Sequence, residues 1–408
     1  MEKKTSMPMD VLPAVGKKDC SAPGEGTAEN TADLDEYVKL AMKQALEAAE
    51  SGTYGVGGIL MDMDGKVLCE MHNQVIKESR INDPTAHGER QIVDWYFENK
   101  EKLKLPEPAD CILITTLDPC VMCTGALAQA GFGRVIVIAM DHYAGINWKG
   151  SDECAALDGT DCREYVREHF AYPAVTGEEA REAFGADLSG LKPFADCTVT
   201  TETFRGCRDA FRLRFSDSRA KLFSNAVDVG DIQNPAELDP DHPICRYLKE
   251  AFGEDCFGCT WKPGDSAEAV TKYMEEKHPG FDGVAYFDLF GNLLCLAEKD
   301  PDITSRSAFM KVTRKYAAVR DTEPIEGYEI NRYLSHPKYG YFVYMTCPEV
   351  SDVTIMELGA IGSTLGNASL HPIMYINGRE KEAAVEAVIR QLPPLYSEQL
   401  KIRFEQIV

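Results

Sequence analysis

Residues 111–123, which read CILITTLDPCVMC, predict a strand that runs directly into a helix. The apolar run over residues 111–116 is typical of a buried strand. Pro119 suits the first turn of a helix, where its missing N–H group is not needed. Cys120 and Cys123 stand three positions apart at this helix start, so both sulfurs are expected on one helical face.

A second motif lies upstream, where Asp83-Pro-Thr-Ala-His87-Gly-Glu89 places a histidine two residues before a glutamate. The electropositive start of a helix favours thiolates, the form of cysteine that binds metal. One imidazole and two thiolates, from His87, Cys120 and Cys123, would leave a tetrahedral zinc ion with one open position, as in catalytic sites. Glu89 would not reach the metal easily but can reach a water bound there.

This set of residues predicts the hydrolytic removal of an exocyclic amine. Zinc lowers the pKa of its bound water towards neutrality. A carboxylate in the place of Glu89 can take the proton of that water and return it to a ring nitrogen and to the leaving ammonia. The two motifs in this order, with a strand before the second, match the signature of zinc deaminases.

Either motif alone carries less information. An isolated Cys-x-x-Cys is also typical of a structural zinc knuckle or a redox pair, but a knuckle needs further ligands, usually a second cysteine pair. Cys256 and Cys259 form such a pair with no His or Cys spaced to complete a site, so we expect them to be structural thiols. Most of the 14 cysteines are expected to be reduced and buried.

The chain of 408 residues is too long for one compact core and predicts two domains. Residues 1–30 lack periodicity and predict a flexible N-terminal tail. Alternating helix and strand patterns over residues 31–222 predict a three-layer α/β/α domain, the expected catalytic domain. Residues 223–240 are rich in turn formers and predict a linker. Residues 241–408 form the expected second domain.

Within the first domain, the expected elements are helices over residues 34–46, from Pro84 into the nineties and from Pro119, and strands at residues 58–62, 66–71, 111–116 and 134–139. The Asp64-Gly65 pair between the first two strands is a hairpin signal.

The second domain repeats this hairpin. Residues 57–69, GGILMDMDGKVLC, and residues 283–295, GVAYFDLFGNLLC, share Gly, Asp, Gly, Leu and Cys at one constant offset. A hairpin of this kind could recur by chance, but five coincidences followed by the same element order favour duplication.

The second copy lacks the motifs. The segment Ser305-Arg-Ser-Ala308 stands where His87 and Glu89 stand in the first, and Pro348-Glu-Val-Ser-Asp352 replaces the cysteine motif. Glu349 and Asp352 keep a ligand spacing, but no His or Cys is placed to complete a site. We expect a degenerate, pseudo-catalytic domain.

Residues 34–222 resemble the cytidine/deoxycytidylate deaminase superfamily, in the branch that includes fungal cytosine deaminase, guanine deaminase and tRNA adenosine deaminase. The resemblance implies a central mixed five-stranded sheet between helices, here duplicated, and a Zn²⁺ cofactor. It places His87, Cys120 and Cys123 as the zinc ligands and Glu89 as the proton shuttle. Small members of this branch are typically homodimers, so the second copy would supply a partner surface as an intramolecular pseudo-dimer; further homodimerisation stays open.

The same resemblance implies three substrate contacts. Asn73 matches an asparagine that hydrogen-bonds the base, and Asp118 fills a position whose backbone carbonyl contacts the leaving amino group. Trp148 stands where fungal cytosine deaminase has an aromatic residue over its base, although an aromatic residue there can also simply pack.

The subfamily motifs point in different directions. His87-Gly-Glu89 resembles cytosine deaminase, whereas residues 83–86 resemble guanine and tRNA adenosine deaminases. His142 stands near the position where guanine deaminases carry an acidic residue, which argues against guanine.

The formal net charge of -23 disfavours broad nucleic-acid binding, and no basic cluster with interleaved aromatics lies near the motifs. No apolar run is long enough to span a bilayer, and no apolar segment typical of a signal peptide follows the first residues. We therefore expect a cytoplasmic enzyme of nucleobase metabolism that acts on a small aminated heterocycle, such as a cytosine-type free base. A nucleic-acid deaminase and a non-catalytic zinc-binding regulatory module are the alternatives.

Overall fold

The computed structural model describes residues 33–147, 160–178, 185–188, 191, 193–225, 227–299, 306–347, 349–366 and 373–405. The expected N-terminal tail and Trp148 lie outside the described residues. Together the described residues belong to one compact unit, Thr31–Val408. No helix of the described part is long and apolar enough to cross a membrane.

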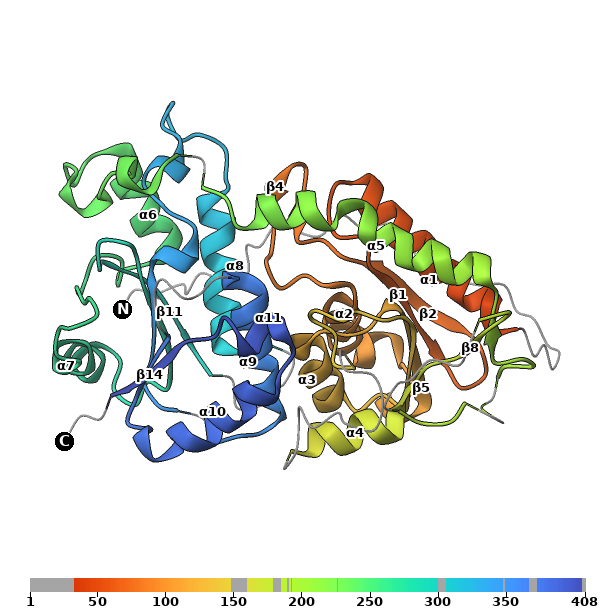
Figure 1. Ribbon diagram of the computed structural model, residues 1–408. Coiled ribbons are helices and arrows are strands. Elements are labelled where there is room, and N and C mark those ends of the chain that lie inside the picture. Colours follow the sequence, from red (N-terminus) through yellow and green to blue (C-terminus); the bar gives the residue numbers. More distant parts are fainter. Residues whose placement is uncertain are drawn as a thin grey trace, which may run out of the picture. The chain divides into compact units, whose positions relative to one another are not determined.

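The first half is built around a mixed five-stranded sheet with the strand order β2-β1-β5-β6-β7 (Figure 1). The β1–β2 and β1–β5 pairs are antiparallel, and the β5–β6 and β6–β7 pairs are parallel. Its elements are α1 (Leu34–Glu50), β1 (Gly57–Asp62), β2 (Val67–His72), α2 (Gly88–Leu103), β5 (Cys111–Leu117), α3 (Val121–Ala130), β6 (Arg134–Ala139), α4 (Asp161–His169), β7 (Phe170–Ala171) and α5 (Thr201–Leu222). Two small sheets add β3 (Ile76–Lys77) with β4 (Arg80–Ile81) and β8 (Ala174–Val175) with β9 (Thr198–Val199).

Successive side chains of the strands alternate between two cores, so this half has three layers. On β5, Leu113 belongs to the core under α2 and α3, and its neighbours Ile112 and Ile114 belong to the core under α1 and α5. Val135 and Ile136 of β6 divide in the same way. Because successive strand side chains point to opposite faces, a fully apolar strand fills both cores at once.

The second half contains a sheet of the same kind, with the order β11-β10-β12-β13-β14 and the same sequence of antiparallel and parallel pairs. Its elements are α6 (Pro243–Phe252), α7 (Glu268–Lys277), β10 (Gly283–Phe287), β11 (Leu293–Glu298), α8 (Ala308–Arg320), β12 (Tyr341–Tyr344), α9 (Asp352–Leu365), β13 (Ile373–Ile376), α10 (Glu382–Gln391), α11 (Pro394–Ser397) and β14 (Ile402–Glu405). Short 3-10 helices lie at Pro108–Asp110, Val229–Asp231, Pro235–Glu237, Ile330–Arg332, Pro337–Tyr339 and Arg379–Lys381. Two of these lie in the segment expected as a linker.

The hairpins of the two halves have the same register. Gly57 pairs with His72 in the first and Gly283 with Glu298 in the second, and a bulge follows the fourth residue of β1 and of β10 alike.

The two turns are alike in detail. In the first, Asp62 Oδ1 accepts from the backbone N–H groups of residues 64 and 66 at 3.0 and 2.9 Å; in the second, Asp288 Oδ1 accepts from those of residues 290 and 292, both at 2.8 Å. Gly65 and Gly291 both adopt a positive φ, 89° and 86°, which favours glycine. These shared details support our proposal that the halves arose by duplication.

The helix after the hairpin begins later than expected. We expected a start near Pro84, but α2 begins at Gly88. Asp83 Oδ1 accepts from both the N–H and the hydroxyl of Thr85 at 2.8 Å, so residues 83–87 form turns instead. Asp followed by Pro favours such a turn, because the carboxylate replaces a backbone acceptor and Pro fixes φ.

The two halves meet along α3 and α9, where the backbones approach closely. A Cβ atom at Gly125 would lie 2.5 Å from the backbone nitrogen of Met356, and one at Gly359 would lie 2.0 Å from that of Met122. The contact is reciprocal, since each helix offers a glycine to the other. One buried apolar cluster continues from α3 through α9 into the second sheet.

Candidate active site

Three candidate ligands converge at the starts of two helices. His87 is the N-cap of α2, Cys120 is the N-cap of α3, and Cys123 lies in the first turn of α3. His87 Nδ1 lies 3.5 Å from Cys120 Sγ and 3.7 Å from Cys123 Sγ. The three ligand atoms all lie within 4.8 Å of one another.

This spacing fits a zinc ion. Bond lengths of about 2.0–2.1 Å to nitrogen and about 2.3 Å to sulfur put these two atoms roughly 3.6 Å apart around a tetrahedral zinc ion. The two nitrogen–sulfur distances lie on either side of that value. Among the described residues this is the only group of three or more His, Cys, Asp or Glu side chains that could hold a metal, and it leaves out Cys256 and Cys259.

The electrostatics of the group favour a thiolate. The hydrogen bond from Cys123 holds the pKa of the Cys120 thiol well below its usual value, against burial and with help from His87. Burial lowers the pKa of His87, but the negative Cys120 beside it produces a net rise. Burial also raises the pKa of Cys123 well above its usual value.

Glu89 lies against this group on the first turn of α2 and is buried, with 3% of its surface exposed. Its Oε1 accepts a hydrogen bond from Thr115 Oγ1 at 2.8 Å, and Cys123 Sγ lies 3.4 Å from Oε2. Burial and then the negative Cys120 raise the pKa of Glu89. A raised pKa suits a carboxyl group that takes up and releases a proton near neutral pH.

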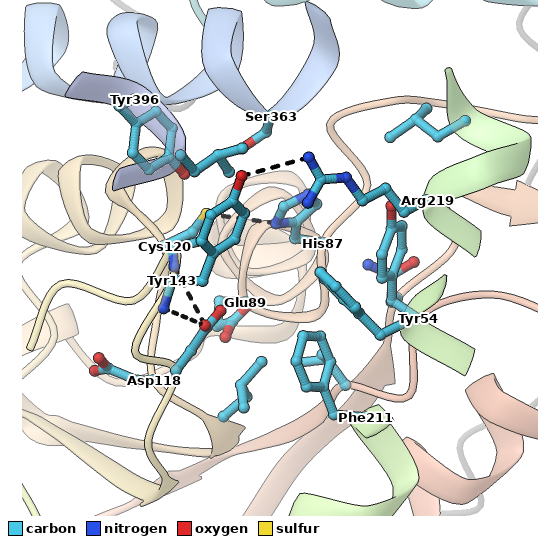
Figure 2. A pocket seen from close by; sticks show the side chains of 18 of the residues that line it. Tyr54, His87, Glu89, Asp118, Cys120, Tyr143, Phe211, Arg219, Ser363 and Tyr396 are labelled. Carbon is cyan, nitrogen blue, oxygen red and sulfur yellow. Dashed lines mark hydrogen bonds between the residues drawn. The ribbon is translucent and has the colours of Figure 1, made fainter. Parts of the chain in front are cut away.

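The ligand group opens into a cavity with an empty volume of about 730 Å³, including the part open to solvent (Figure 2). From the first half, the lining includes His87, Glu89, Asn73, Asp118, Cys120, Tyr54, Tyr143, Phe211, Phe215, Arg219 and Phe223. The second half contributes Ser363 of α9 together with Leu395 and Tyr396 of α11.

Comparison with known proteins identifies the family of the chain. The family model of the cytidine and deoxycytidylate deaminase zinc-binding region matches residues 31–139. A tRNA-specific adenosine deaminase from Aquifex aeolicus is 33% identical over 109 residues, which are 27% of this chain and 68% of that protein. This chain belongs to the cytidine and deoxycytidylate deaminase superfamily.

Other relatives of this chain differ in their named substrates. A cytosine deaminase from Candida albicans is 29% identical over 131 residues, covering 32% of this chain and 79% of the relative. A guanine deaminase from Bacillus subtilis is 33% identical over 106 residues, covering 26% of this chain and 64% of the relative. The α/β fold and the family expected from the sequence are confirmed, whereas the comparisons leave the substrate undecided.

Asn73 lines the cavity just after β2. Its Oδ1 accepts from Thr53 Oγ1 at 2.6 Å and from the backbone N–H of Val75 at 3.0 Å. These bonds fix the amide plane. Among the described residues no partner takes a hydrogen bond from Nδ2, which leaves this donor for a ligand.

Asp118, whose backbone carbonyl is expected to contact the leaving amino group, lines the cavity. Its buried carboxylate accepts from Tyr172 Oη at 2.8 Å and from the backbone N–H of Asn147 at 2.9 Å. Burial raises its pKa to about 8, against these two bonds. The side chain therefore fixes the backbone of Asn147 and the ring of Tyr172 beside the cavity, contacts that the motif did not predict.

Sequence reasoning missed the aromatic wall on α5. Phe211, Phe215, Arg219 and Leu222 recur every three or four positions and line the cavity from one face of the helix. This spacing was a signal in the sequence. No such signal marked Ser363 or Tyr396, which reach the cavity through the packing of α9 and α11.

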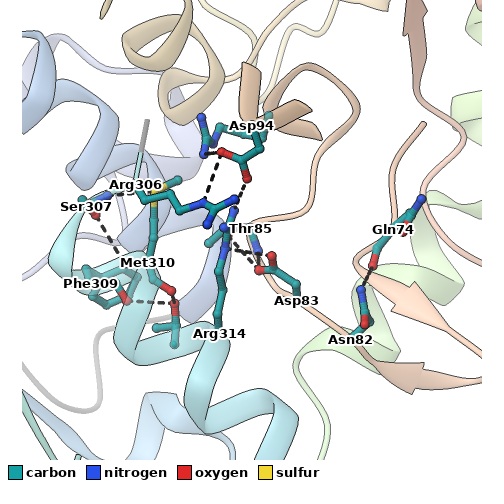
Figure 3. Close-up of polar contacts among 12 residues, drawn as sticks. Gln74, Asn82, Asp83, Thr85, Asp94, Arg306, Ser307, Phe309, Met310 and Arg314 are labelled. Atoms are coloured by element: carbon teal, nitrogen blue, oxygen red, sulfur yellow. Dashed lines mark hydrogen bonds and ion pairs between the residues drawn. The ribbon is translucent and has the colours of Figure 1, made fainter. Parts of the chain in front are cut away.

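A cluster of charged residues connects the second half to the turn before His87 (Figure 3). Arg314 of α8 donates to Thr85 Oγ1 at 2.8 Å and pairs with Asp83 at 2.8 Å and Asp94 at 3.2 Å. Asp94 is shared with Arg90, at 2.8 Å. Arg306 contacts Asp94 at 3.5 Å and also pairs with Glu98.

Proposed function

We propose that this chain is a zinc-dependent hydrolytic deaminase that converts the exocyclic amine of a small, nucleobase-like heterocycle to a carbonyl and releases ammonia. The observation that carries the proposal is the meeting of His87, Cys120, Cys123 and the buried Glu89 at one cavity with aromatic walls. Three ligands leave a position open, which a structural zinc site does not need. When bound, zinc would supply the Lewis acid that makes water nucleophilic at neutral pH.

The residues of the chain would divide the remaining work. Glu89 would carry two protons in turn on Oε2, the first from the attacking water to the ring nitrogen and the second from the added hydroxyl group to the leaving amine, while Thr115 holds Oε1 in place. Asn73 would donate from Nδ2 to an acceptor on the ring. Tyr54 and Phe211 would give the flat apolar walls that a heterocycle needs and would exclude water.

We further propose that the second half is pseudo-catalytic and acts as the partner of the first. Ser307 caps α8 as His87 caps α2, and Phe309 follows it at the spacing of Glu89. Glu357 of α9 lies against the start of α8, where its Oε1 accepts from the backbone N–H of Phe309 at 3.3 Å. The place of Ser363 and Tyr396 in the cavity wall supports a partner role.

A nucleic-acid deaminase is the second candidate, since one relative is named a tRNA-specific adenosine deaminase. The net charge of -23 opposes it, because phosphate backbones are bound through Lys and Arg. A gel shift with RNA at low salt separates the small-molecule deaminase from the nucleic-acid deaminase.

A regulatory module that binds zinc only for its structure is the third candidate. This candidate function gives no role to Glu89.

The variant Glu89→Gln tests the proposed function. Zinc-loaded wild type should release ammonia from a member of a panel of aminated bases, nucleosides and nucleotides, and Glu89→Gln should lower the rate by about 10²–10⁴-fold, because general acid–base catalysis is lost. Zinc content, measured by mass spectrometry, should stay the same. Glu101→Gln, an exposed position on α2, is the matched control and should keep full activity. Turnover by Glu89→Gln at the wild-type rate would contradict the proposal.

A further inference from the structure

Arg219 is a cation in the cavity that has no acidic partner among the described residues. It lies on α5, half-buried, with its guanidinium 5.3 Å from the ring centre of Tyr143 and 5.9 Å from that of Phe215. Its one hydrogen bond to a described residue runs to Tyr143 Oη at 3.4 Å (Figure 2). Five N–H groups on a guanidinium therefore have only one weak acceptor.

Two other arginines of the same helix contact carboxylates. Arg208 contacts Asp209 at 2.9 Å, and Arg214 contacts Asp217 at 3.7 Å and donates to a backbone carbonyl. In a chain with 66 acidic and 43 basic residues, carboxylates are the more abundant partners. Within the described part of the chain none of them pairs with Arg219.

A second unpaired cation lies next to it. Phe215, Arg219 and Phe223 line both the cavity and an adjoining hollow, and that hollow is also lined by Lys338 of the second half. Lys338 Nζ donates to the backbone carbonyl of Phe223 at 3.1 Å and pairs with no carboxylate of a described residue. Arg219 thus stands at the border between the two spaces, and the two halves of the chain each provide one cation.

The charges in the combined space are separated by sign. The acidic lining residues Glu89, Asp118 and Asp141 belong to the cavity with the ligand group, whereas Lys338 lines only the adjoining hollow. Arg219 lies where the two spaces join. A bound molecule with an uncharged ring at the ligand group and a negative group at Arg219 would match this distribution.

We propose that Arg219 and Lys338 form an anion-binding subsite, and that the substrate is a small aminated heterocycle carrying a phosphate or carboxylate group. For the ring end this inference rests on the proposed function, while the anion subsite stands on the two unpaired cations alone. A guanidinium binds phosphate or carboxylate through two parallel hydrogen bonds, and the ammonium adds a point charge. Two cations suffice for one such group, whereas a nucleic-acid backbone needs a longer basic track.

Binding is measured without turnover, on the zinc-loaded, full-length Glu89→Gln protein. Calorimetry compares adenosine and cytidine with their 5′-monophosphates and with their 5′-carboxylates. At least one charged form should bind about tenfold or more tightly than its nucleoside, because a hydrogen bond to a charged group is lost when the anion is absent. The charged form with the larger gain in affinity over its nucleoside identifies phosphate or carboxylate as the anion. This gain in affinity should shrink as the salt concentration rises.

Variants test whether Arg219 and Lys338 cause the higher affinity for the charged form. Arg219→Gln should abolish the preference for the charged form, Lys338→Gln should reduce it, and Arg219→Lys should keep part of it. Arg212→Gln, an exposed arginine of α5 that lines neither space, is the matched control and should retain the full preference.

Equal binding of charged and uncharged forms, or a preference that survives Arg219→Gln, would overturn the subsite. Tight binding of single-stranded RNA in place of the nucleotides would also overturn it, in favour of a nucleic-acid substrate. The binding assay does not depend on turnover, so it tests the subsite separately from the deaminase activity. If the wild type releases no ammonia but the protein still prefers the anion, the proposed activity is refuted and the subsite is retained. If the wild type releases ammonia from uncharged substrates and binding shows no preference for the charged form, the deaminase activity is retained and the subsite is refuted.

Discussion

Arg314 is the residue through which the second half holds the turn before His87. It is largely buried and contacts Asp83, Thr85 and Asp94, and the first two of these shape the turn. Groups that orient a metal ligand commonly change metal affinity by about 10–100-fold when they are removed. We therefore propose that Arg314, through Asp83 and Thr85, helps to place His87 for the candidate zinc site.

We expect Arg314→Ala to weaken zinc binding by about 10-fold or more and to lower the free energy of unfolding by roughly 3 kcal/mol, because it leaves Asp83 without its cation. Zinc affinity is measured by competition with a chelator, and stability by urea unfolding. Arg246→Ala is the control, since its pair with Glu326 is exposed and worth about 0–1 kcal/mol. A loss of stability with unchanged zinc affinity would show that Arg314 has no part in placing His87.

Individual residues differ in how well the sequence predicts them. His87, Cys120 and Cys123 could be predicted because their types and spacings satisfy a chemical requirement, and the structure brings them within ligand distance. Arg314 and Tyr396 could not, because their contacts join segments more than two hundred residues apart. Only the packing of the two halves creates those contacts.

At the level of elements, α3 and α9 decide how the second half meets the candidate site. Glycines at the crossing, Gly125 and Gly359, allow backbone to touch backbone. Cys120 and Cys123 lie at the start of α3, and Ser363 lies near the end of α9. A shift of either helix would therefore move a metal ligand relative to the wall of the cavity.

Gly359→Ala should destabilise the protein by about 1–3 kcal/mol, since a methyl group there would overlap backbone atoms of Met122 and force the helices apart. Ammonia release should fall with it. Thermal unfolding gives the stability, and Gly230→Ala serves as the control, because a Cβ there meets nothing within 4 Å and its φ needs no glycine. Equal stability of both variants would show that the crossing is not tightly packed.

The elements themselves followed largely from the sequence. The strand at residues 134–139 has the predicted bounds, and the hairpin at Asp64-Gly65 is present. The start of α2 was wrong by four residues, because the Asp83 side chain completes a turn that competes with helix formation. Side-chain hydrogen bonds decide between such a turn and a helix, and the spacing of apolar residues does not predict these bonds.

In the whole molecule, the first half has the candidate ligand group, and the second half has a sheet of the same kind but no such group among its described residues. The second half contributes to the cavity wall, to the turn before His87 and to the proposed anion subsite. We propose that these contacts are the reason for its retention.

The central claim is that His87, Cys120 and Cys123 hold a catalytic zinc ion with one open position. X-ray absorption at the zinc edge of the zinc-loaded, full-length protein measures this directly. We expect one zinc ion per chain, bound by two sulfurs at about 2.3 Å, one imidazole nitrogen and one further light atom from water. A closed shell with three or four sulfurs, or with a second imidazole, would contradict it and would favour a structural zinc site.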